Sequence, residues 1–337
     1  IGRSASAKVF EEAGCDFFAV TFIEEALELR KAGIRGSILA MAPIDTGELE
    51  KAAENDVIVT LTEKEAAEEL SRKAAGLGKV IKAHLKLDTG LSRLGIVTAH
   101  REHEAAAECG EIISLPGIDV IGIYTHITSA DKSVPGGDEL NLRELRRFKT
   151  VCDMLEEKGY QLTRHCLSSG PLKNYPEYAC EYVRLGDILY GPYGNIPGAY
   201  GIYPVKNCIY LKSRIIQVKE IPCGSSISYG PMFTTLRDTK IAVVPIGFAD
   251  GLRRALSNIG CMLVKGHRAP IVGKICCDHT ILDVTDIPDV KRGDIVTIFG
   301  RDGELEQTAG NYAKLIGAST SEITSILSQR IPRIMLQ

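Results

Sequence analysis

The chain has 337 residues, of which 45% are hydrophobic, so it can bury a large core and, at roughly 150 residues per domain, is expected to contain two domains. Its 40 Lys and Arg residues nearly balance its 43 Asp and Glu residues, which excludes a charged surface for nucleic acid or an anionic membrane. No apolar run approaches the roughly 20 residues that span a bilayer. We therefore expect a soluble protein whose partners are small molecules or a second copy of itself.

The ten cysteines show no CxxC pair and no spacing typical of a metal site or a disulfide framework. We interpret them as reduced thiols that serve as small buried hydrophobes, and we expect no metal. The neighbours Cys276 and Cys277 could be bridged only with strain. The chain begins at Ile1 without a signal peptide, which favours a cytoplasmic catalytic domain, and the sequence leaves open whether a membrane domain precedes it.

Residues 1–205 alternate short β-rich runs with amphipathic helical segments, a pattern typical of β/α units around a parallel sheet. A closed parallel barrel has eight strands, and we count seven after an opening helix. We therefore expect an α/β fold, a (β/α)8 TIM barrel that lacks its first strand in this chain; an open α/β sheet is the alternative. The predicted strands are 16–20, 37–41, 56–60, 80–88, 120–126, 164–168 and 182–190, and helices include 4–13, 24–32 and 63–75.

A Gly- and Pro-rich stretch at 191–204 places a domain boundary near residue 205. From 206 to 337, β-branched runs are broken by Gly, Pro and Asp, which predicts a C-terminal, mainly β domain. The predicted strands of this domain are 214–219, 240–246, 261–264, 270–275 and 294–299, and the predicted helices are 308–315 and 321–328.

Polar residues follow several of the predicted barrel strands at their carboxyl ends, where parallel barrels build their sites. Arg93 closes a polar run after the fourth strand, and His126 ends the fifth. Ser169 and Gly186 come from late strands, where backbone N–H groups and hydroxyls commonly bind phosphate. Taken singly, His126 is more often a structural histidine and Arg184 an ion-pair partner.

Taken together, these segments resemble the alanine/serine racemase family along the whole chain, in order. The resemblance implies an enzyme of fold type III: a barrel that carries pyridoxal phosphate, a β domain, and a head-to-tail homodimer in which each β domain completes the partner's active site. It also implies a Schiff-base lysine, which we expect just upstream of Ile1. The matching motifs are KAHLKLDTGLSRLGI (82–96), IYTH (123–126) with Ala130 and Asp131, VRLGDILYG (183–191), SISYG (226–230), VPIGFADG (244–251), GKICCDH (273–279), KRGDIV (291–296) and RIPR (330–333).

The resemblance also implies residue roles. Tyr229 would be the second proton-transfer group, on the face opposite the lysine. Arg93 would reach the cofactor and the substrate carboxylate, oriented by Lys86, which carries a carbamate in many family members. His126 and Arg184 would form a network behind the cofactor, with Arg184 facing the pyridine nitrogen. The implied cofactor-binding residues are Ser169, Arg184, Gly186, His165, Tyr190 and Ser321, and the implied substrate-binding residues are Arg93, Cys277, Asp278, Tyr229, Phe248 and Ser321.

Four positions depart from the family pattern: Cys277 replaces a usual Met, Phe248 a frequent Tyr, Ser168 a usual Asn, and Ser321 a Tyr that narrows the pocket of alanine racemases. The serine racemases associated with vancomycin resistance lack that tyrosine. We therefore expect racemisation of serine, alanine or both by two-base proton transfer, which would supply D-amino acids for peptidoglycan precursors. A strict alanine racemase and a non-catalytic pyridoxal-phosphate-binding protein of the same barrel are the alternatives; a fold-type III decarboxylase would need motifs that the sequence lacks.

Overall fold

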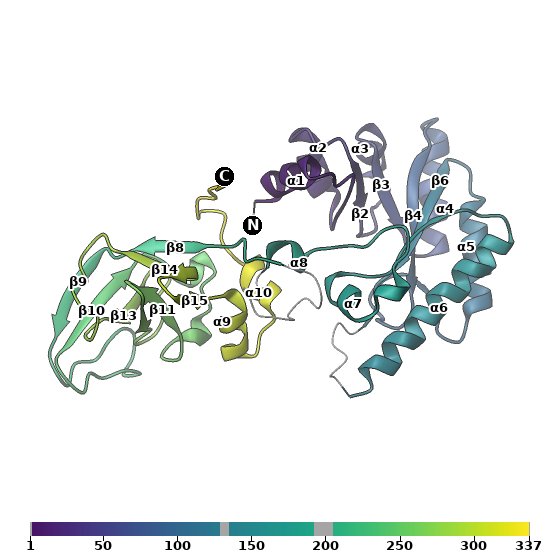
Figure 1. Cartoon of the computed structure of the whole chain (residues 1–337). Coiled ribbons are helices and arrows are strands. Elements are labelled where there is room, and N and C mark those ends of the chain that lie inside the picture. Colours follow the sequence, from purple (N-terminus) through teal and green to yellow (C-terminus); the bar gives the residue numbers. More distant parts are fainter. Residues whose placement is uncertain (1, 129–134, 192–204, 337) are drawn as a thin grey trace. The chain divides into compact units, whose positions relative to one another are not determined.

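The computed structural model describes residues 2–128, 135–191 and 205–336 (Figure 1). Ala130 and Asp131 of the second motif, and nearly all of the 191–204 stretch, lie outside these ranges. The chain divides into two compact units, Gly2–Gly186 and Asp187–Gln337. This division lies earlier in the chain than the boundary that we expected near residue 205.

The first unit is built on a parallel sheet whose strand order, β1-β2-β3-β4-β6-β7, follows the order of the chain, and β5 pairs with β4. Every neighbouring pair in this path is parallel. Such an order is that of consecutive β/α units around a barrel, as predicted. The strands are β1 (Phe17–Val20), β2 (Ser37–Ala40), β3 (Val57–Leu61), β4 (Ile81–Asp88), β5 (Ile96–Val97), β6 (Ile118–Thr125) and β7 (Thr163–His165).

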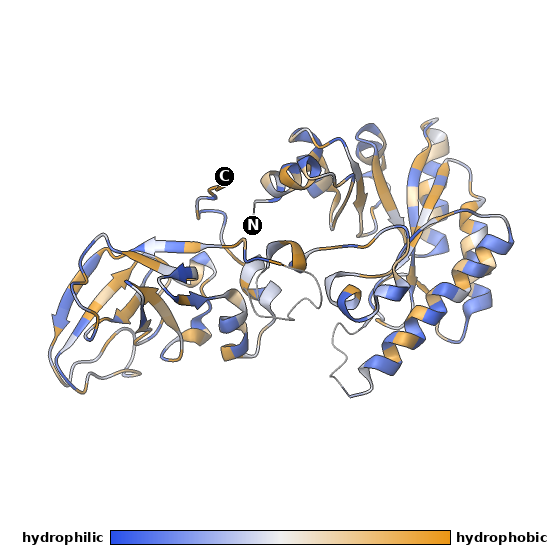
Figure 2. Cartoon of the chain, viewed as in Figure 1, coloured by the Kyte–Doolittle hydropathy of each residue, from blue (hydrophilic) through white to orange (hydrophobic). Residues whose placement is uncertain are grey.

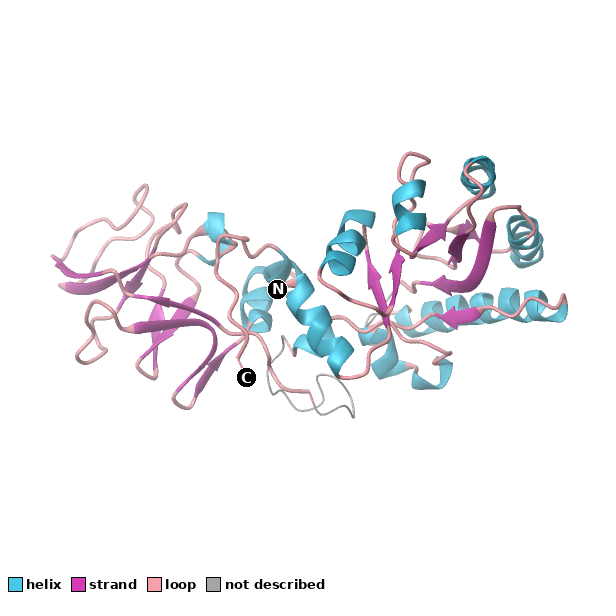
Figure 3. Cartoon of the chain, turned by 90° about the horizontal axis from the view of Figure 1, so that it is seen from above, coloured by secondary structure: helices cyan, strands magenta, loops and turns pink. Residues whose placement is uncertain are grey.

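Helices cover one face of this sheet, and α4, α5 and α6 lie side by side along it (Figures 1 and 3). The long helix α6 buries Leu145, Phe148, Val151 and Leu155, which recur every three to four residues and form one apolar stripe (Figure 2). The opposite face of the sheet holds a smaller cluster around Tyr124. The helices are α1 (Arg3–Glu12), α2 (Ile23–Lys31), α3 (Leu49–Glu54), α4 (Lys64–Gly76), α5 (Glu102–Ile113), α6 (Gly137–Glu157), α7 (Ser169–Asn174) and η1 (Pro176–Tyr178).

The second unit is mainly β, as predicted, and is built on two antiparallel sheets around its own core. One sheet has the order β13-β10-β9, and the other has the order β12-β11-β14-β15 with β8 on β14. Its elements are α8 (Asp187–Tyr190), β8 (Leu211–Arg214), β9 (Gln217–Ile221), β10 (Thr239–Val244), η2 (Phe248–Asp250), η3 (Arg254–Leu256), β11 (Cys261–Val264), β12 (His267–Pro270), β13 (Thr280–Asp283), β14 (Ile295–Asp302), β15 (Leu305–Gln307), α9 (Ala309–Ile316) and α10 (Thr320–Ser325).

Three predicted strands are wrong. The 182–190 segment contributes only one parallel bridge, between Ser168 and Arg184, and then forms the helix α8. Its alternating apolar residues predicted a half-buried strand, but in the helix only Ile188 is buried. The predicted strand 270–275 is not formed, because the observed strand β12 ends at Pro270 and the chain turns at Gly273, which has a φ of +74°. The predicted strand 214–219 is interrupted at residues 215 and 216, between β8 and β9. The short strands β5, β13 and β15 were not predicted. No helix in the described ranges is long and apolar enough to cross a membrane.

Candidate active site

Three neighbouring strands bring Lys86, Tyr124 and His165 into one row. Lys86 of β4 is in register with Tyr124 of β6, which is in register with His165 of β7. The Tyr124 and His165 rings stack almost parallel, with centroids 4.7 Å apart and 7° between planes. The Lys86 Nζ lies 5.3 Å from the Tyr124 ring centroid, within reach of a cation–π interaction. All three side chains are buried.

His165 joins a chain of three polar side chains. Its Nδ1 lies 2.8 Å from an Arg184 guanidinium nitrogen, and its Nε2 lies 2.8 Å from the Nδ1 of His84. A guanidinium has only donors, so the His165 Nδ1 must accept and its Nε2 must carry the proton. His84 must then accept at its own Nδ1. One arginine therefore fixes the tautomers of two histidines.

Gly122 makes room for this arrangement. It lies opposite His84 in the register between β4 and β6, and a Cβ at this position would stand 2.5 Å from the His84 ring. Real Cβ contacts are essentially never so short. The His84 ring therefore occupies the space that a side chain at residue 122 would need, which explains a glycine inside a buried strand.

The cation of Arg184 is held by neutral acceptors. Its guanidinium donates to the carbonyl oxygens of Thr125 at 2.6 Å and His165 at 2.8 Å, and it lies 3.5 Å from the Nδ1 of His126. No carboxylate hydrogen-bonds this guanidinium among the residues that the structure describes. Burial lowers the pKa of Arg184 to about 10, which leaves it charged at neutral pH.

Burial and this positive charge lower the pKa values of the surrounding basic groups. Burial, reinforced by Arg184, lowers the pKa of His84 to about 4 and that of His165 to about 2. The same causes lower the pKa of His126 to about 4. Burial, followed by the charges of Arg93 and Arg184, lowers the pKa of Lys86 to about 8. The three histidines are therefore neutral at pH 7.

A candidate phosphate site follows β7. The Ser169 hydroxyl accepts a hydrogen bond from the Gly186 N–H at 2.9 Å, so a hydroxyl and a backbone donor converge. A Cβ at Gly186 would meet no atom within 4 Å, which shows open space beside the backbone. The Gly186 N–H thus holds the Ser169 hydroxyl beside this open space, where a phosphate oxygen could meet it. Arg93 is exposed after β4 and Tyr190 ends α8.

In the second unit, the loop that carries Tyr229 presents its phenol to solvent. Tyr229 is 68% exposed, whereas Ile227 two residues earlier is buried in a small core. The flanking residues Ser228 and Gly230 both have positive φ, at 65° and 70°. Ser228 is anchored by a 2.6 Å hydrogen bond from its Oγ to the Lys274 carbonyl. The loop is thus shaped to project this tyrosine outward.

The loop around Cys277 packs against the turn that carries Phe248. The Phe248 and Ala249 N–H groups donate to the Cys276 and Cys277 carbonyls at 3.1 and 3.0 Å. The contact is possible because Gly247 has no Cβ; one would lie 2.3 Å from both carbonyl oxygens. Within the described ranges, no hydrogen bond uses the Cys277 N–H. This N–H is therefore available to an acceptor.

Arg330 ties this loop to the C-terminal segment. Its Nε donates to Asp250 at 2.6 Å, and its second guanidinium nitrogen donates to Asp278 at 2.5 Å. The hydrogen bond from Arg330 lowers the pKa of Asp278. The Asp278 side chain is thus committed to Arg330, and a substrate contact at Asp278 would have to use its remaining acceptor capacity or its backbone.

Ser321, at the start of α10, makes a contact that the sequence did not suggest. Its hydroxyl lies 3.0 and 2.8 Å from the two carboxylate oxygens of Asp187, the first residue of α8. A hydroxyl has a single proton, which is donated here. Towards any other group, the Ser321 hydroxyl oxygen can therefore only accept a hydrogen bond.

The structure thus brings together two sets of predicted residues, one in each unit. Lys86, His126, His165 and Arg184 meet in the first unit, where Ser169 also contacts Gly186; Phe248, Cys277 and Asp278 meet in the second. Sequence reasoning missed His84, Tyr124 and Asp187. The first two stand two residues before Lys86 and His126 on their strands, so the two-residue period of a strand could have assigned them to the same face.

Comparison with known proteins assigns both units to one family. Family models of the alanine racemase N-terminal and C-terminal domains match residues 2–194 and 208–335. An alanine racemase of Methanococcus maripaludis is 37% identical over 99% of this chain and 88% of its own length. The alanine racemase structure from Clostridium difficile 630 has a TM-score of 0.88 at 32% identity, covering 98% of this chain and 84% of that chain.

A third relative contains the cofactor that the motifs imply. The Bartonella henselae alanine racemase, with covalently bound pyridoxal phosphate, has a TM-score of 0.84 at 26% identity, and the match covers 99% of this chain and 88% of that chain. The relatives thus agree with the fold and with the order of the two domains, and this chain belongs to the alanine racemase family of amino-acid racemases.

Proposed function

We propose that this protein interconverts L- and D-alanine, and also L- and D-serine, with pyridoxal phosphate, and that the D-enantiomers supply peptidoglycan precursors. The observation that carries the cofactor assignment is Arg184, a half-buried cation held only by neutral acceptors among the described residues. Such a guanidinium suits an uncharged ring nitrogen, to which it can only donate. When bound, pyridoxal phosphate supplies the electron sink that acidifies the α-hydrogen of the amino acid.

Residues that follow β7, together with the Arg184 network, would hold this cofactor. Ser169, held by the hydrogen bond from the Gly186 N–H, would bind the phosphate, and the open space at Gly186 would admit it. Tyr190 would contribute as the family resemblance implies. Arg184 would donate to the pyridine nitrogen without surrendering its proton, which keeps that nitrogen unprotonated. His165 uses both ring nitrogens on protein partners, so it would act by holding Arg184 in place.

The substrate carboxylate would meet Arg93 and the Cys277 N–H, and Tyr229 would move the α-proton on one face. A phenol has a reference pKa of about 10, so it is a poor base at neutral pH unless its surroundings favour the phenolate. The cation of Arg93 would supply such surroundings. We infer that Tyr229 comes from the partner subunit, because its loop projects it into solvent.

Lys86 is a candidate for carbamylation, as in many family members. Carbamate formation needs the neutral amine, and burial lowers the pKa of Lys86 to about 8, which raises the fraction of neutral amine at pH 7. The carbamate would replace a cation by an anion beside Arg93 and Arg184. Charge complementarity therefore supports the modification.

Ser321 supports serine as a substrate. Its hydroxyl proton is donated to Asp187, so its oxygen can accept the hydrogen bond of a substrate hydroxyl. It is also much smaller than the tyrosine that alanine racemases carry at this position. A pocket narrowed around a methyl group would penalise the serine hydroxyl by about 1–3 kcal/mol, which is roughly 10- to 150-fold in relative kcat/KM.

Substitution of Ser321 tests the serine activity. In the full-length protein at saturating pyridoxal phosphate, Ser321→Tyr is expected to lower the serine-to-alanine ratio of kcat/KM by about tenfold or more. The matched variant Ser321→Ala removes the hydroxyl without adding bulk, so it should lower this ratio less. If Ser321→Tyr slows both substrates alike, the residue only supports cofactor binding and the serine assignment fails. Absence of any racemisation in the wild type would refute the proposed function itself.

Shared active sites predict complementation between subunits. Tyr229→Phe damages the second unit, and Arg93→Ala damages the first at an exposed residue. Each homodimer should be inactive. In a verified heterodimer, one site carries both defects and the other carries none, so about half of the wild-type activity per dimer should return. Heterodimers that stay inactive would show that each subunit builds its own site.

A further inference from the structure

We propose that Cys166 and Cys180 form a redox-active thiol pair that closes to a disulfide at the edge of the candidate site. Their sulfur atoms lie 3.9 Å apart. Both thiols also lie against the same acceptor, the Tyr178 carbonyl, at 3.3 Å from Cys166 and 3.6 Å from Cys180. All ten cysteines of the chain are free in this structure.

Backbone hydrogen bonds join the segment that carries Cys166 to the segment that follows Cys180. Tyr182 donates its N–H to the Arg164 carbonyl at 3.3 Å, and Arg184 donates its N–H to the Leu167 carbonyl at 2.9 Å. The segments before and after the two cysteines therefore already lie side by side. A disulfide bond has a length of about 2.05 Å, so the sulfurs need to approach by about 2 Å. Side-chain rotation with a small backbone adjustment covers such a distance.

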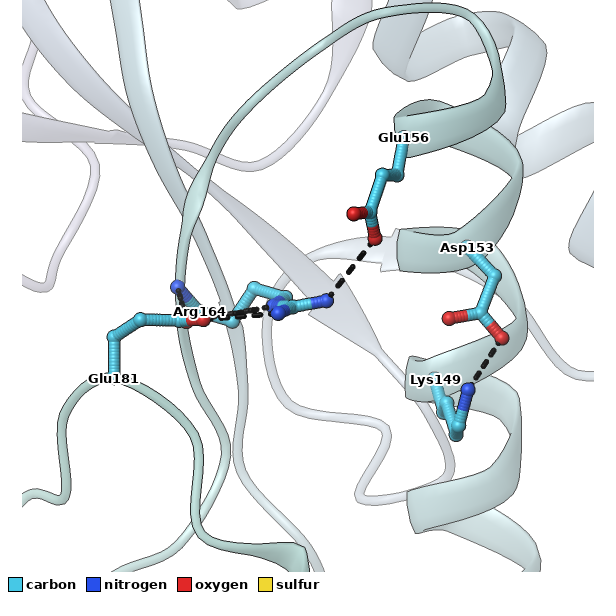
Figure 4. A network of polar contacts seen from close by, with 5 residues as sticks. All are labelled: Lys149, Asp153, Glu156, Arg164 and Glu181. Carbon is cyan, nitrogen blue, oxygen red and sulfur yellow. Dashed lines mark hydrogen bonds and ion pairs between the residues drawn. The ribbon is translucent and has the colours of Figure 1, made fainter.

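Arg164 fixes the segment that carries Cys180 (Figure 4). Its guanidinium lies 2.9 Å from one oxygen of Glu181 and 3.5 Å from Glu156 on α6. The Arg164 N–H also donates to the Glu181 carboxylate at 2.7 Å. Since Glu181 directly follows Cys180, this clamp holds Cys180 beside β7, where Cys166 follows the last strand residue.

The two thiols differ in a way that sets the order of reaction. Cys166 is only 2% exposed, whereas Cys180 is partly exposed and can be reached from solvent. The hydrogen bond from Cys166 lowers the pKa of Cys180, although burial opposes it, and the same contact raises the pKa of Cys166. Cys180 is therefore the attacking thiolate and Cys166 the thiol that resolves the intermediate.

A small disulfide such as oxidised glutathione is the oxidant. The Cys180 thiolate attacks one glutathione sulfur, the S–S bond of the oxidant breaks, and one glutathione thiolate leaves and takes up a proton. Cys166 then loses its proton to solvent and attacks the Cys180 sulfur, which releases the second glutathione. Two protein thiols are oxidised, two glutathione thiols are formed, and two electrons have moved to the oxidant.

The bridge would act on the candidate site directly. It closes a loop that contains Ser169, and it joins the residue after His165 to the segment that leads to Arg184. Oxidation would therefore lock the distance between the candidate phosphate-binding serine and the Arg184 network. The pairing of the two thiols rests on their geometry and holds whichever substrate the enzyme uses.

Mass spectrometry of the reacted thiols tests the pair. The full-length protein is incubated with oxidised glutathione, its remaining thiols are blocked with N-ethylmaleimide, and proteolytic peptides are sequenced. We expect a Cys166–Cys180 disulfide in the wild type and a mixed glutathione disulfide at Cys180 in Cys166→Ser. Neither species should form in Cys180→Ser. The control Cys152→Ser removes a neighbouring thiol whose pKa is raised by burial, and it should leave the bridge intact.

The melting temperature gives a second readout. Closing a loop of this length in a native-like geometry should raise the melting temperature of the oxidised wild type by several degrees, about 5 °C, and reduction should reverse the rise. Both serine variants should show no such response. The proposal is overturned if the folded wild type keeps both thiols reduced in oxidised glutathione, if glutathione attaches first to Cys166, or if Cys152 proves to be the partner of either cysteine.

Discussion

The chain Arg184–His165–His84 predicts a specific loss of stability in mild acid. Arg184 and the two tautomers that it fixes leave each histidine with one ring nitrogen that accepts and one that carries a proton. A second proton on either ring would break a hydrogen bond of the chain beside a permanent cation. The folded protein therefore resists protonation at pH values where the unfolded chain accepts it.

The size of the effect follows from the two pKa values. An unfolded histidine titrates near pH 6.5, whereas folding lowers the pKa of His84 to about 4 and that of His165 to about 2. Between pH 7 and pH 5 the unfolded state thus binds protons that the folded state refuses, and stability falls with pH. Each histidine accounts for a loss of about 2 kcal/mol over this interval, so the pair accounts for about 4 kcal/mol.

Urea unfolding followed by circular dichroism at pH 7 and pH 5 measures this loss. The variant His84→Asn should reduce the pH-dependent part by about 2 kcal/mol, whatever its effect on stability at pH 7. The control His103→Asn replaces an exposed histidine of α5 and should leave the wild-type difference unchanged. The reasoning is wrong if the unfolding free energy is the same at both pH values, or if His84→Asn loses as much stability on acidification as the wild type.

Two further substitutions test other parts of the structure. Gly122→Ala places a Cβ against the His84 ring, so it should lower the free energy of unfolding by about 2–5 kcal/mol through crowding and a lost buried hydrogen bond. The control Gly76→Ala, where a Cβ meets nothing within 4 Å, should leave this free energy unchanged. Urea unfolding measures both variants, and equal effects would show that the His84 ring does not fill the space beside Gly122. Tyr229→Phe should abolish α-hydrogen exchange with deuterated water from one enantiomer while cofactor absorbance persists; equally fast exchange from both enantiomers would exclude Tyr229 as a base.

The sequence predicted the elements whose periodicity is strong. The strands that became β2, β3 and β4 carry mostly buried runs between clear turn residues. The prediction failed at 182–190, where a short apolar run fits a strand and a helix equally well. Only tertiary pairing, which allows a single bridge at Arg184, decides between them.

The sequence predicted several residues of the candidate site, but it did not predict their hydrogen-bond partners. Motif resemblance pointed to Arg184, His126 and His165, because these residues match family positions. It could not show that His84 fixes the tautomer of His165, since that depends on the register between β4, β6 and β7. The contact between Ser321 and Asp187 joins residues 134 positions apart, and no local pattern in the sequence encodes such a pair.

The two ion pairs of Arg330 have a consequence for protein engineering. One guanidinium ties Asp250, beside the Phe248 turn, to Asp278, beside Cys277, so the rigidity of that loop depends on a residue close to the last described position. A truncation at residue 329 would remove no residue proposed to touch the substrate. It would nevertheless leave the carboxylates of Asp250 and Asp278 without their shared counter-ion, and the Cys277 loop would become more mobile. Tags should therefore extend the C-terminus of this chain and never replace its final residues.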